Sequence, residues 1–440
     1  VDFGQNINGR VRLSALGPAD TETVLTHGEA LDPDGDVTMD HLVANVPFLP
    51  DITAGQVDRV VSAGRDGDVF EPRFTTHGFR YVRLEGDLPH VTPDDVTAVV
   101  VHTDLEPRGG FTCSDQRLRR LHDAAVWSFR GNACDIPTDC PTRERSGWTG
   151  DWQLYVPTAS YLFDVAGFST KWLRDLVAGQ WEDGTLNNMA PMPRAERSGF
   201  LKRLNGSAGW GDAIVLVPWE LYTEYGDAAV LGDCWPAMVR WLDRMERVAG
   251  EARHPDRAAR HPEPRPHDGY LWDTGYHWGE WLEPGGFPDD FLAFAAADKG
   301  DVATAYFAWS TRHAALVAEV LGDEEAAARY ADLSRAVVDA WRQEYVEDDR
   351  VVPHTQANLV RALRFDLLPE ELRARAAANL AALVREAGVH VGTGFLATPD
   401  LLPVLADHGH LDLAYELLLQ DSEPSWLTML DRGAATVWEV

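Results

Sequence analysis

The chain has 440 residues, enough for at least two folding units, because an average domain has roughly 100–200 residues. Apolar residues make up 45% of the chain and charged residues 25%, the balance of a globular protein rather than a disordered or fibrous one. The formal net charge of −31 would repel phosphate backbones and anionic lipid, and the apolar stretches are too short to span a bilayer, so nucleic-acid and membrane partners are not expected.

Short runs of alternating apolar and polar residues fill the chain from residue 1 to about 105. They include GRVRLSAL at 9–16, FRYVRLEG at 79–86 and DVTAVVVHTDL at 95–105, and clusters of Gly, Pro and Asp separate them. This pattern predicts antiparallel β structure, with a sandwich as the favoured form. We expect a β-sandwich domain over residues 1–108, incomplete at its N-terminus.

The apolar period becomes helical after residue 112. Leu118, Leu121, Ala125 and Phe129 recur at helical spacing behind Ser114, the expected N-cap. Further stripes are Phe168, Trp172 and Leu176; Trp235, Met238, Leu242 and Met245; Ala327, Tyr330, Leu333, Val337 and Trp341; and Leu372, Ala376, Leu380 and Leu383. The fold class is therefore mainly α with an N-terminal β part, and roughly eleven helical segments are expected from 114 to 440. Without a fixed repeat length, a closed double ring of helices is favoured over a solenoid.

The densest group of polar, aromatic and turn residues lies at 135–151, DIPTDCPTRERSGWTGD. Two prolines and two glycines exclude a continuous helix, so we expect a loop that leads into the helix DWQLYVPTASYLF. This loop carries Asp135, Asp139, Arg143, Glu144, Arg145 and Asp151. Carboxylates on such loops are typical of glycosidases, although Asp151 could simply cap the helix.

Two further features are interpreted without a catalytic role. The segment 250–270 is rich in Pro, Arg and His and has no apolar face, so a surface loop is expected; its histidines, His254, His261 and His267, match no zinc spacing. The four cysteines at 113, 134, 140 and 234 contain no Cys-x-x-Cys pair, so buried free thiols are expected. Because a targeting segment could lie outside Val1–Val440, localisation in the cytoplasm or outside the cell stays open.

The sequence resembles the bacterial α-L-rhamnosidases of glycoside hydrolase family 78. The resemblance rests first on DIPTDCPTRERSGWTGDWQ at 135–153. Supporting blocks are DFGQNINGRVRL at the start, EPRFTTHGFRYVRLEG at 71–86, CSDQRLRRLHDAAVWSFRGN at 113–132, WGDAIVLVPW at 210–219, TGFLATP at 393–399 and RGAATVWE at 432–439. These blocks cover nearly the whole chain in the order that the family has.

This resemblance implies a β-sandwich followed by an (α/α)6 toroid at 109–440 and the inverting hydrolysis of terminal non-reducing α-L-rhamnose residues from a glycoside or polysaccharide. It implies that Glu144 is the general acid and Glu439 the general base. Asp139, Arg143 and Asp151 would bind the sugar, and Trp148, Trp210 and Trp281 would form an aromatic wall. No cofactor or metal is implied, because side chains supply both proton transfers.

Departures from the family pattern leave alternatives open. CPTRE is one residue shorter than the common form of the loop, and Trp278 competes with Trp281 for the position in the wall. The sequence also ends before a substrate-contacting His of the family, so residues 1–440 are expected to lack the end of the toroid and to be nearly inactive or poorly soluble. The alternatives are a catalytically silent carbohydrate-binding protein, another toroidal glycosidase, or a polysaccharide lyase.

Overall fold

The computed structural model describes residues 1–42, 55–88, 91–192, 199–285 and 290–438. Two compact units divide the chain. The first comprises Val1–Ser146 and Met429–Val440, and the second comprises Gly147–Thr428. The change from strands to helices, where the domain boundary at 108 was predicted, lies between strand β7 (Val96–Val100) and helix α1 (Gln116–Asn132).

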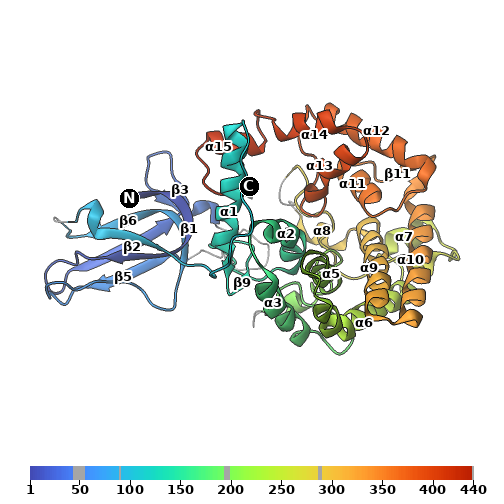
Figure 1. Cartoon of the computed structure of the whole chain (residues 1–440), viewed down its shortest axis with the longest axis horizontal. Helices are drawn as coiled ribbons and strands as arrows, with labels where there is room; N and C mark the ends of the chain where they lie inside the picture. The colour runs from blue at the N-terminus through green and yellow to red at the C-terminus, as the bar shows by residue number, and fades with distance from the viewer. Residues whose placement is uncertain (43–54, 89–90, 193–198, 286–289, 439–440) are drawn as a thin grey trace. The chain divides into compact units, whose positions relative to one another are not determined.

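The first unit contains a five-stranded antiparallel sheet in the order β5-β2-β6-β1-β7 (Figure 1). These strands are β1 (Asp2–Leu13), β2 (Glu22–Gly28), β5 (Val57–Val61), β6 (His77–Gly86) and β7, and β3 (Ala30–Leu31) and β4 (Val37–Thr38) form a short ladder of their own. Alternate residues such as Val11, Leu25 and Phe79 are fully buried in one core. The predicted antiparallel β part is confirmed, and in the described residues it is one main sheet with a small ladder.

Helix α1 follows the sheet and packs on its core through Trp127. The helix begins one residue later than predicted, because Asp115 rather than Ser114 is the N-cap. The carboxylate of Asp115 accepts a hydrogen bond of 2.8 Å from the backbone N–H of Arg117. After α1, the two-residue strands β8 (Ala133–Cys134) and β9 (Ile136–Pro137) pair and lead into the 138–148 loop.

The second unit is helical apart from a short ladder of β10 (Val346–Glu347) and β11 (Arg350–Val351). Its longer helices are α2 (Thr149–Leu162), α3 (Ala166–Ala178), α5 (Ala213–Tyr225), α6 (Ala228–Glu251), α9 (Gly300–Leu321), α10 (Glu324–Tyr345), α11 (Gln356–Arg364), α12 (Glu370–Glu386), α13 (Thr398–Asp407) and α14 (Leu411–Leu418). Shorter helices are α4 (Gly199–Lys202), α7 (Pro255–Arg260) and α8 (Phe291–Ala296), and α15 (Trp426–Asp431) spans the boundary between the units. The described helices outnumber the roughly eleven expected, because helices of four to six residues are too short to show a period.

The long helices of this unit form two layers. Helices α2, α5, α9, α11 and α13 contact one another in that order, and α6, α10, α12 and α14 pack against their chain neighbours outside them (Figure 1). Helix α9 is buried around most of its circumference, whereas α10 buries one stripe that includes Tyr330, Val337 and Trp341. This difference is what an inner and an outer layer require, and it confirms the predicted double-layered helical architecture.

The prediction of a surface loop at 250–270 is wrong in part, since α7 lies inside this segment. The cause is an ionic core that apolar periodicity does not reveal. Arg257 is fully buried and forms ion pairs with Asp268, at 2.9 Å, and with Asp273. A buried guanidinium between two carboxylates holds the segment against the helical unit.

Two smaller observations complete the fold. All four cysteines are free thiols; Cys234 is buried, and Cys113, Cys134 and Cys140 are half-buried rather than buried. None of the helices in the described part of the chain combines the length and apolarity that crossing a membrane requires.

Candidate active site

The 138–148 loop holds the carboxyl groups of Glu144 and Asp139 in the first unit. Glu144 accepts a hydrogen bond of 2.8 Å from Arg143. The side chain of Glu144 is 33% exposed, so its carboxyl group is open to solvent. The backbone N–H of Glu144 donates to the sulfur of Cys140 at 3.2 Å. The loop thus fixes the backbone of Glu144 and pairs its carboxylate with the guanidinium of Arg143.

Asp139 is the more buried of the two acids. Its Oδ1 accepts from the backbone N–H of Ser146 at 2.9 Å, and its own N–H donates to the Ser146 carbonyl at 3.1 Å, which closes the loop around Glu144. Burial, and then the negative charge of Glu144, raise the pKa of Asp139 to about 7. The carboxyl group of Asp139 therefore holds a proton for part of the time near neutral pH.

Local backbone strain accompanies these acids. Arg145 has a φ of +50°, a left-handed conformation that costs a non-glycine residue about 1–3 kcal/mol. Its guanidinium donates to the carbonyl of Thr76 at 2.8 Å, which compensates part of this cost. The structure therefore uses a specific contact to hold a strained residue directly after Glu144.

Helix α2 opens the second unit and carries Trp148 and Asp151. The helix begins at Thr149, and Trp148 is its N-cap residue. Asp151 therefore lies in the first turn of the helix and not in the loop, where it was predicted. A Cβ on Gly147 would collide with the carbonyl oxygen of Ala190, and one on Gly150 would lie within 2.9 Å of three ring atoms of Trp210. Both glycines of RSGWTGD are thus required by close packing rather than by a turn.

Four aromatic rings surround Trp278. Their centroids lie at 4.8 Å for Trp281, 4.9 Å for Tyr276, 5.7 Å for Trp148 and 6.0 Å for Trp210. The three nearest are edge-to-face contacts, the geometry that aromatic quadrupoles favour. The structure thus brings together all three predicted wall tryptophans, but around Trp278, which the sequence identified only as a competitor of Trp281.

Buried polar contacts fix the segment that carries Trp278. The ring of His277 accepts from the backbone N–H of Ala208 at 3.1 Å through Nδ1, and its Nε2 lies 3.3 Å from the carbonyl of Thr274. The N–H of Trp278 donates to the hydroxyl of Ser207 at 3.1 Å. Burial lowers the pKa of His277 to about 3, so the ring is neutral and can accept the Ala208 hydrogen bond.

The 393–399 segment packs on the other side of the same cluster. Phe395 stacks on Trp210 at 5.6 Å, and its N–H donates to the carbonyl of Trp281 at 2.7 Å. Glu280 accepts from the N–H of Ala397 at 2.9 Å and forms a buried ion pair with Arg361. Four sequence blocks that are far apart in the chain therefore meet at the Trp278 cluster.

Two polar atoms of the cluster are available to a ligand. The hydroxyl of Tyr276 and the indole N–H of Trp278 are buried, and neither has a hydrogen-bond partner within the described residues. Native proteins leave few buried polar groups unpaired, so each one calls for an explanation, and a bound water, ion or ligand is one. A sugar would find apolar ring faces for its C–H groups and donors for its hydroxyl oxygens here.

The predicted site residues fall into three groups. Asp139, Arg143 and Glu144 lie together on the loop of the first unit; Trp148, Asp151, Trp210 and Trp281 belong to the second unit; and Glu439 lies outside the described residues. Sequence reasoning missed Tyr276, Glu280, Arg361 and Phe395. The aromatic density of YHWGEWL at 276–282 was the available signal for the first two.

Comparisons with known proteins agree over the full length. Residues 106–440 match the six-hairpin glycosidase domain of bacterial alpha-L-rhamnosidases, and residues 1–102 match the concanavalin-like domain of the same enzymes. An alpha-L-rhamnosidase of Streptomyces avermitilis is 41% identical over 100% of this chain and 38% of its own length. One from Formosa agariphila is 32% identical over 100% of this chain and 44% of its own.

Solved structures give the same result. The crystal structure of Streptomyces avermitilis alpha-L-rhamnosidase complexed with L-rhamnose superposes with a TM-score of 0.86 at 39% identity, covering 100% of this chain and 38% of that one. The crystal structure of the native rhamnosidase from Aspergillus terreus superposes with a TM-score of 0.86 at 33% identity, covering 100% of this chain and 48% of that one. The chain thus spans less than half the length of these relatives. It belongs to the bacterial α-L-rhamnosidase family and has that family's β part and six-hairpin helical domain.

Proposed function

We propose that this protein hydrolyses terminal non-reducing α-L-rhamnose residues with inversion of configuration. The observation that carries the proposal is the Trp278 cluster, assembled from the sequence blocks of a rhamnosidase. A relative with the same fold is known in complex with L-rhamnose. Rhamnose has a methyl group and apolar C–H faces, and edge-on and stacked indole rings supply contact area for both.

Glu144 is proposed as the general acid that protonates the glycosidic oxygen. Its solvent-open carboxyl group and the partly protonated Asp139 beside it support this role, because Asp139 can pass a proton to Glu144. Arg143, which now pairs with Glu144, would turn to a hydroxyl of the sugar when Glu144 takes up the proton. Asp139 and Asp151 would accept hydrogen bonds from the remaining hydroxyls.

Glu439 is proposed as the general base that deprotonates the attacking water. An inverting pair needs its carboxyl groups roughly 6.5–9.5 Å apart, with room for that water between them. Trp148, Trp210 and Trp281 would bind the sugar together with Trp278. The proposed domains are 1–108 and 109–440, which the change of family match between residues 102 and 106 supports.

The experiment compares single variants on two substrates. Glu144→Ala should lose about 10²–10⁴ in rate on natural rhamnosides and much less on an aryl rhamnoside whose phenolate leaves without protonation. Glu439→Ala should lose activity on both substrates, since the water still needs a base. Equal losses by Glu144→Ala on both substrates would contradict its role as acid.

The stereochemical part has its own measurement. Proton NMR of the anomeric signal during the first minutes should show β-L-rhamnose first, because water attacks the face opposite the leaving group. Initial appearance of the α anomer would require a covalent intermediate, and Glu439 would then be a nucleophile. If wild-type protein binds rhamnose but hydrolyses neither substrate, this chain is a carbohydrate-binding protein instead.

A further inference from the structure

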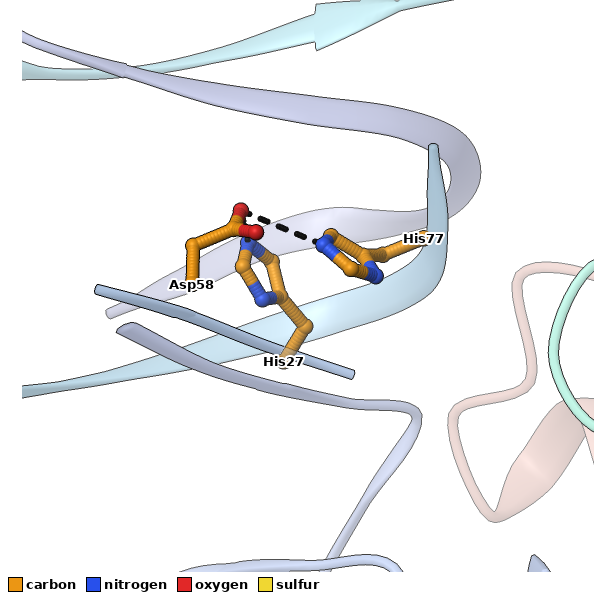
Figure 2. A group of neighbouring side chains, drawn as sticks. All are labelled: His27, Asp58 and His77. Carbon is orange, nitrogen blue, oxygen red and sulfur yellow. Dashed lines mark hydrogen bonds and ion pairs between the residues drawn. The ribbon is translucent and has the colours of Figure 1, made fainter. Parts of the chain in front are cut away.

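Two histidines and one aspartate that have no proposed part in hydrolysis meet in the sheet of the first unit. His27 lies on β2, Asp58 on β5 and His77 at the start of β6 (Figure 2). Each of the three side chains offers one ligand atom, and these atoms lie within 4.8 Å of one another. Among the described residues, these three form the cluster of His, Cys, Asp or Glu side chains whose spacing would suit a metal ion. Imidazole nitrogens and a carboxylate oxygen are the donors that zinc takes.

The tautomer of His27 follows from its surroundings. Its Nδ1 lies 3.1 Å from the carbonyl oxygen of Gln56, and since a carbonyl only accepts, Nδ1 carries the proton. The ring of His27 is fully buried, and burial disfavours the charged imidazolium, so the neutral ring is the favoured form. The Nε2 atom therefore presents a lone pair.

This lone pair is buried without a donor. His27 is fully buried, and its Nε2 has no hydrogen-bond partner in the part of the chain that the structure describes. The polar atom that faces it is Oδ2 of Asp58, at 3.9 Å, which is also an acceptor. Two acceptors that face each other in a protein interior are unfavourable unless a cation lies between them.

His77 completes the group. Its Nε2 lies 3.1 Å from the same Oδ2, and its ring stacks on that of His27 with centroids 4.2 Å apart. Zinc bonds of about 2.0–2.1 Å in tetrahedral geometry place neighbouring ligand atoms roughly 3.3 Å apart. The separations of 3.1 and 3.9 Å from Oδ2 bracket that value, and the ligand atoms of the two histidines lie within 4.8 Å of each other.

Gln56 orients both histidines from outside the group. Its carbonyl fixes the ring of His27, and its side-chain amide accepts from the N–H of Gly78 at 2.8 Å and donates to the Gly78 carbonyl at 2.9 Å. Gly78 is the residue after His77, so one buried residue contacts the ring of His27 through its backbone and the chain next to His77 through its side chain. Hydrogen bonds to the second ring nitrogen and to the backbone are the usual support of metal-binding histidines.

We propose that His27, Asp58 and His77 bind one Zn²⁺ ion, with water or an exogenous ligand in the fourth position. The ion would tie β5, β2 and β6 together and stabilise the sheet, without a part in hydrolysis. Calcium and magnesium do not suit the group, because they prefer oxygen ligands. The competing interpretation is a metal-free cluster in which His77 donates its proton to Asp58 and His27 only stacks.

The test uses the full chain without a histidine tag, treated with chelator and dialysed. Titration calorimetry with Zn²⁺ alone should show one tight equivalent, and metal analysis after gel filtration should recover it. His77→Gln and Asp58→Asn should each weaken Zn²⁺ binding at least tenfold. His102→Gln, at an exposed histidine of the same unit, should bind like the wild type.

Two further readouts keep the outcome clear. Zn²⁺ should raise the unfolding temperature of the wild type and His102→Gln, since a ligand that binds the folded state stabilises it. It should not raise that of His77→Gln. Co²⁺ added to the wild type should give the visible absorption bands of a tetrahedral site. This measurement needs no variant, so it tests the site even if a variant does not fold. Absence of a stoichiometric tight site, or equal binding by His77→Gln, would overturn the proposal.

Discussion

Replacing Gly150 by alanine tests the packing that holds the aromatic cluster together. The added Cβ would lie 2.8–2.9 Å from three ring atoms of Trp210, whereas carbon atoms in contact prefer about 3.5–4.0 Å. The indole would have to retreat by roughly 0.6–1.2 Å. Trp210 is 3% exposed and is packed between Phe395 and Trp278, so it has no free space into which to move.

Overpacking of this kind costs about 1–3 kcal/mol, and the better helix propensity of alanine offsets about 0.5–1 kcal/mol of it. Gly150→Ala should therefore lower the free energy of unfolding by about 1–2 kcal/mol and reduce rhamnoside hydrolysis. The measurements are urea unfolding followed by near-ultraviolet circular dichroism, and turnover of an aryl rhamnoside.

Gly167→Ala is a matched control. Gly167 is the second residue of α3, as Gly150 is of α2, and a Cβ there would meet nothing within 4 Å. This variant should be as stable as the wild type or more stable, because alanine replaces glycine in an open helix position. If Gly150→Ala matched Gly167→Ala in stability and in its tryptophan dichroism, the close contact between Gly150 and Trp210 would be refuted.

Three other predictions concern single groups of the site. Tyr276→Phe should leave the stability unchanged or higher, because the buried hydroxyl has no partner among the described residues, but should weaken binding of rhamnose measured by calorimetry. In the wild type the unfolded state binds a proton at His277 below pH 6.5, whereas the folded state does so only near pH 3. The free energy of unfolding, measured in urea, should therefore fall by about 2 kcal/mol from pH 7 to pH 5, and this pH dependence should be absent in His277→Asn. Glu144→Gln removes a negative charge and should lower the pKa of Asp139, measured by carbon NMR of its carboxyl group; an unchanged pKa would mean that burial alone raises it.

Much of the fold was predictable because it follows from residue periodicity. Strands β1, β6 and β7 lie where apolar and polar residues alternate, and α3 buries the stripe of Phe168, Trp172 and Leu176. The helix starts were less predictable. At α1 both Ser114 and Asp115 are residue types that cap helices well, so the sequence does not choose between them; in the structure Asp115 is the cap.

The segment 250–270 shows a second limit. A buried arginine carries no apolar signal, and its partners Asp268 and Asp273 become visible only when the chain folds back on itself. The same limit applies to Glu280 and Arg361, which are 81 residues apart and form one buried pair. Charge pairs across long sequence separations leave no local pattern, so sequence reasoning assigned these residues to the surface or passed over them.

The choice between Trp278 and Trp281 shows why the site itself was harder to predict than its motifs. Both tryptophans lie within HWGEWL, and composition gives no reason to prefer either. Backbone geometry decides, because Gly279 and Leu282 have φ values of +66° and +56°. These two left-handed residues turn the chain so that the two rings meet edge to face, with their centroids 4.8 Å apart. Glycine adopts this conformation freely, whereas Leu282 does so at a cost of about 1–3 kcal/mol that surrounding contacts must offset. The hydrogen bond from Phe395 to the Trp281 carbonyl, one residue before Leu282, is such a contact. A strained turn held by a distant loop is a tertiary property, and it makes Trp278 the centre of the cluster and Trp281 one of its walls.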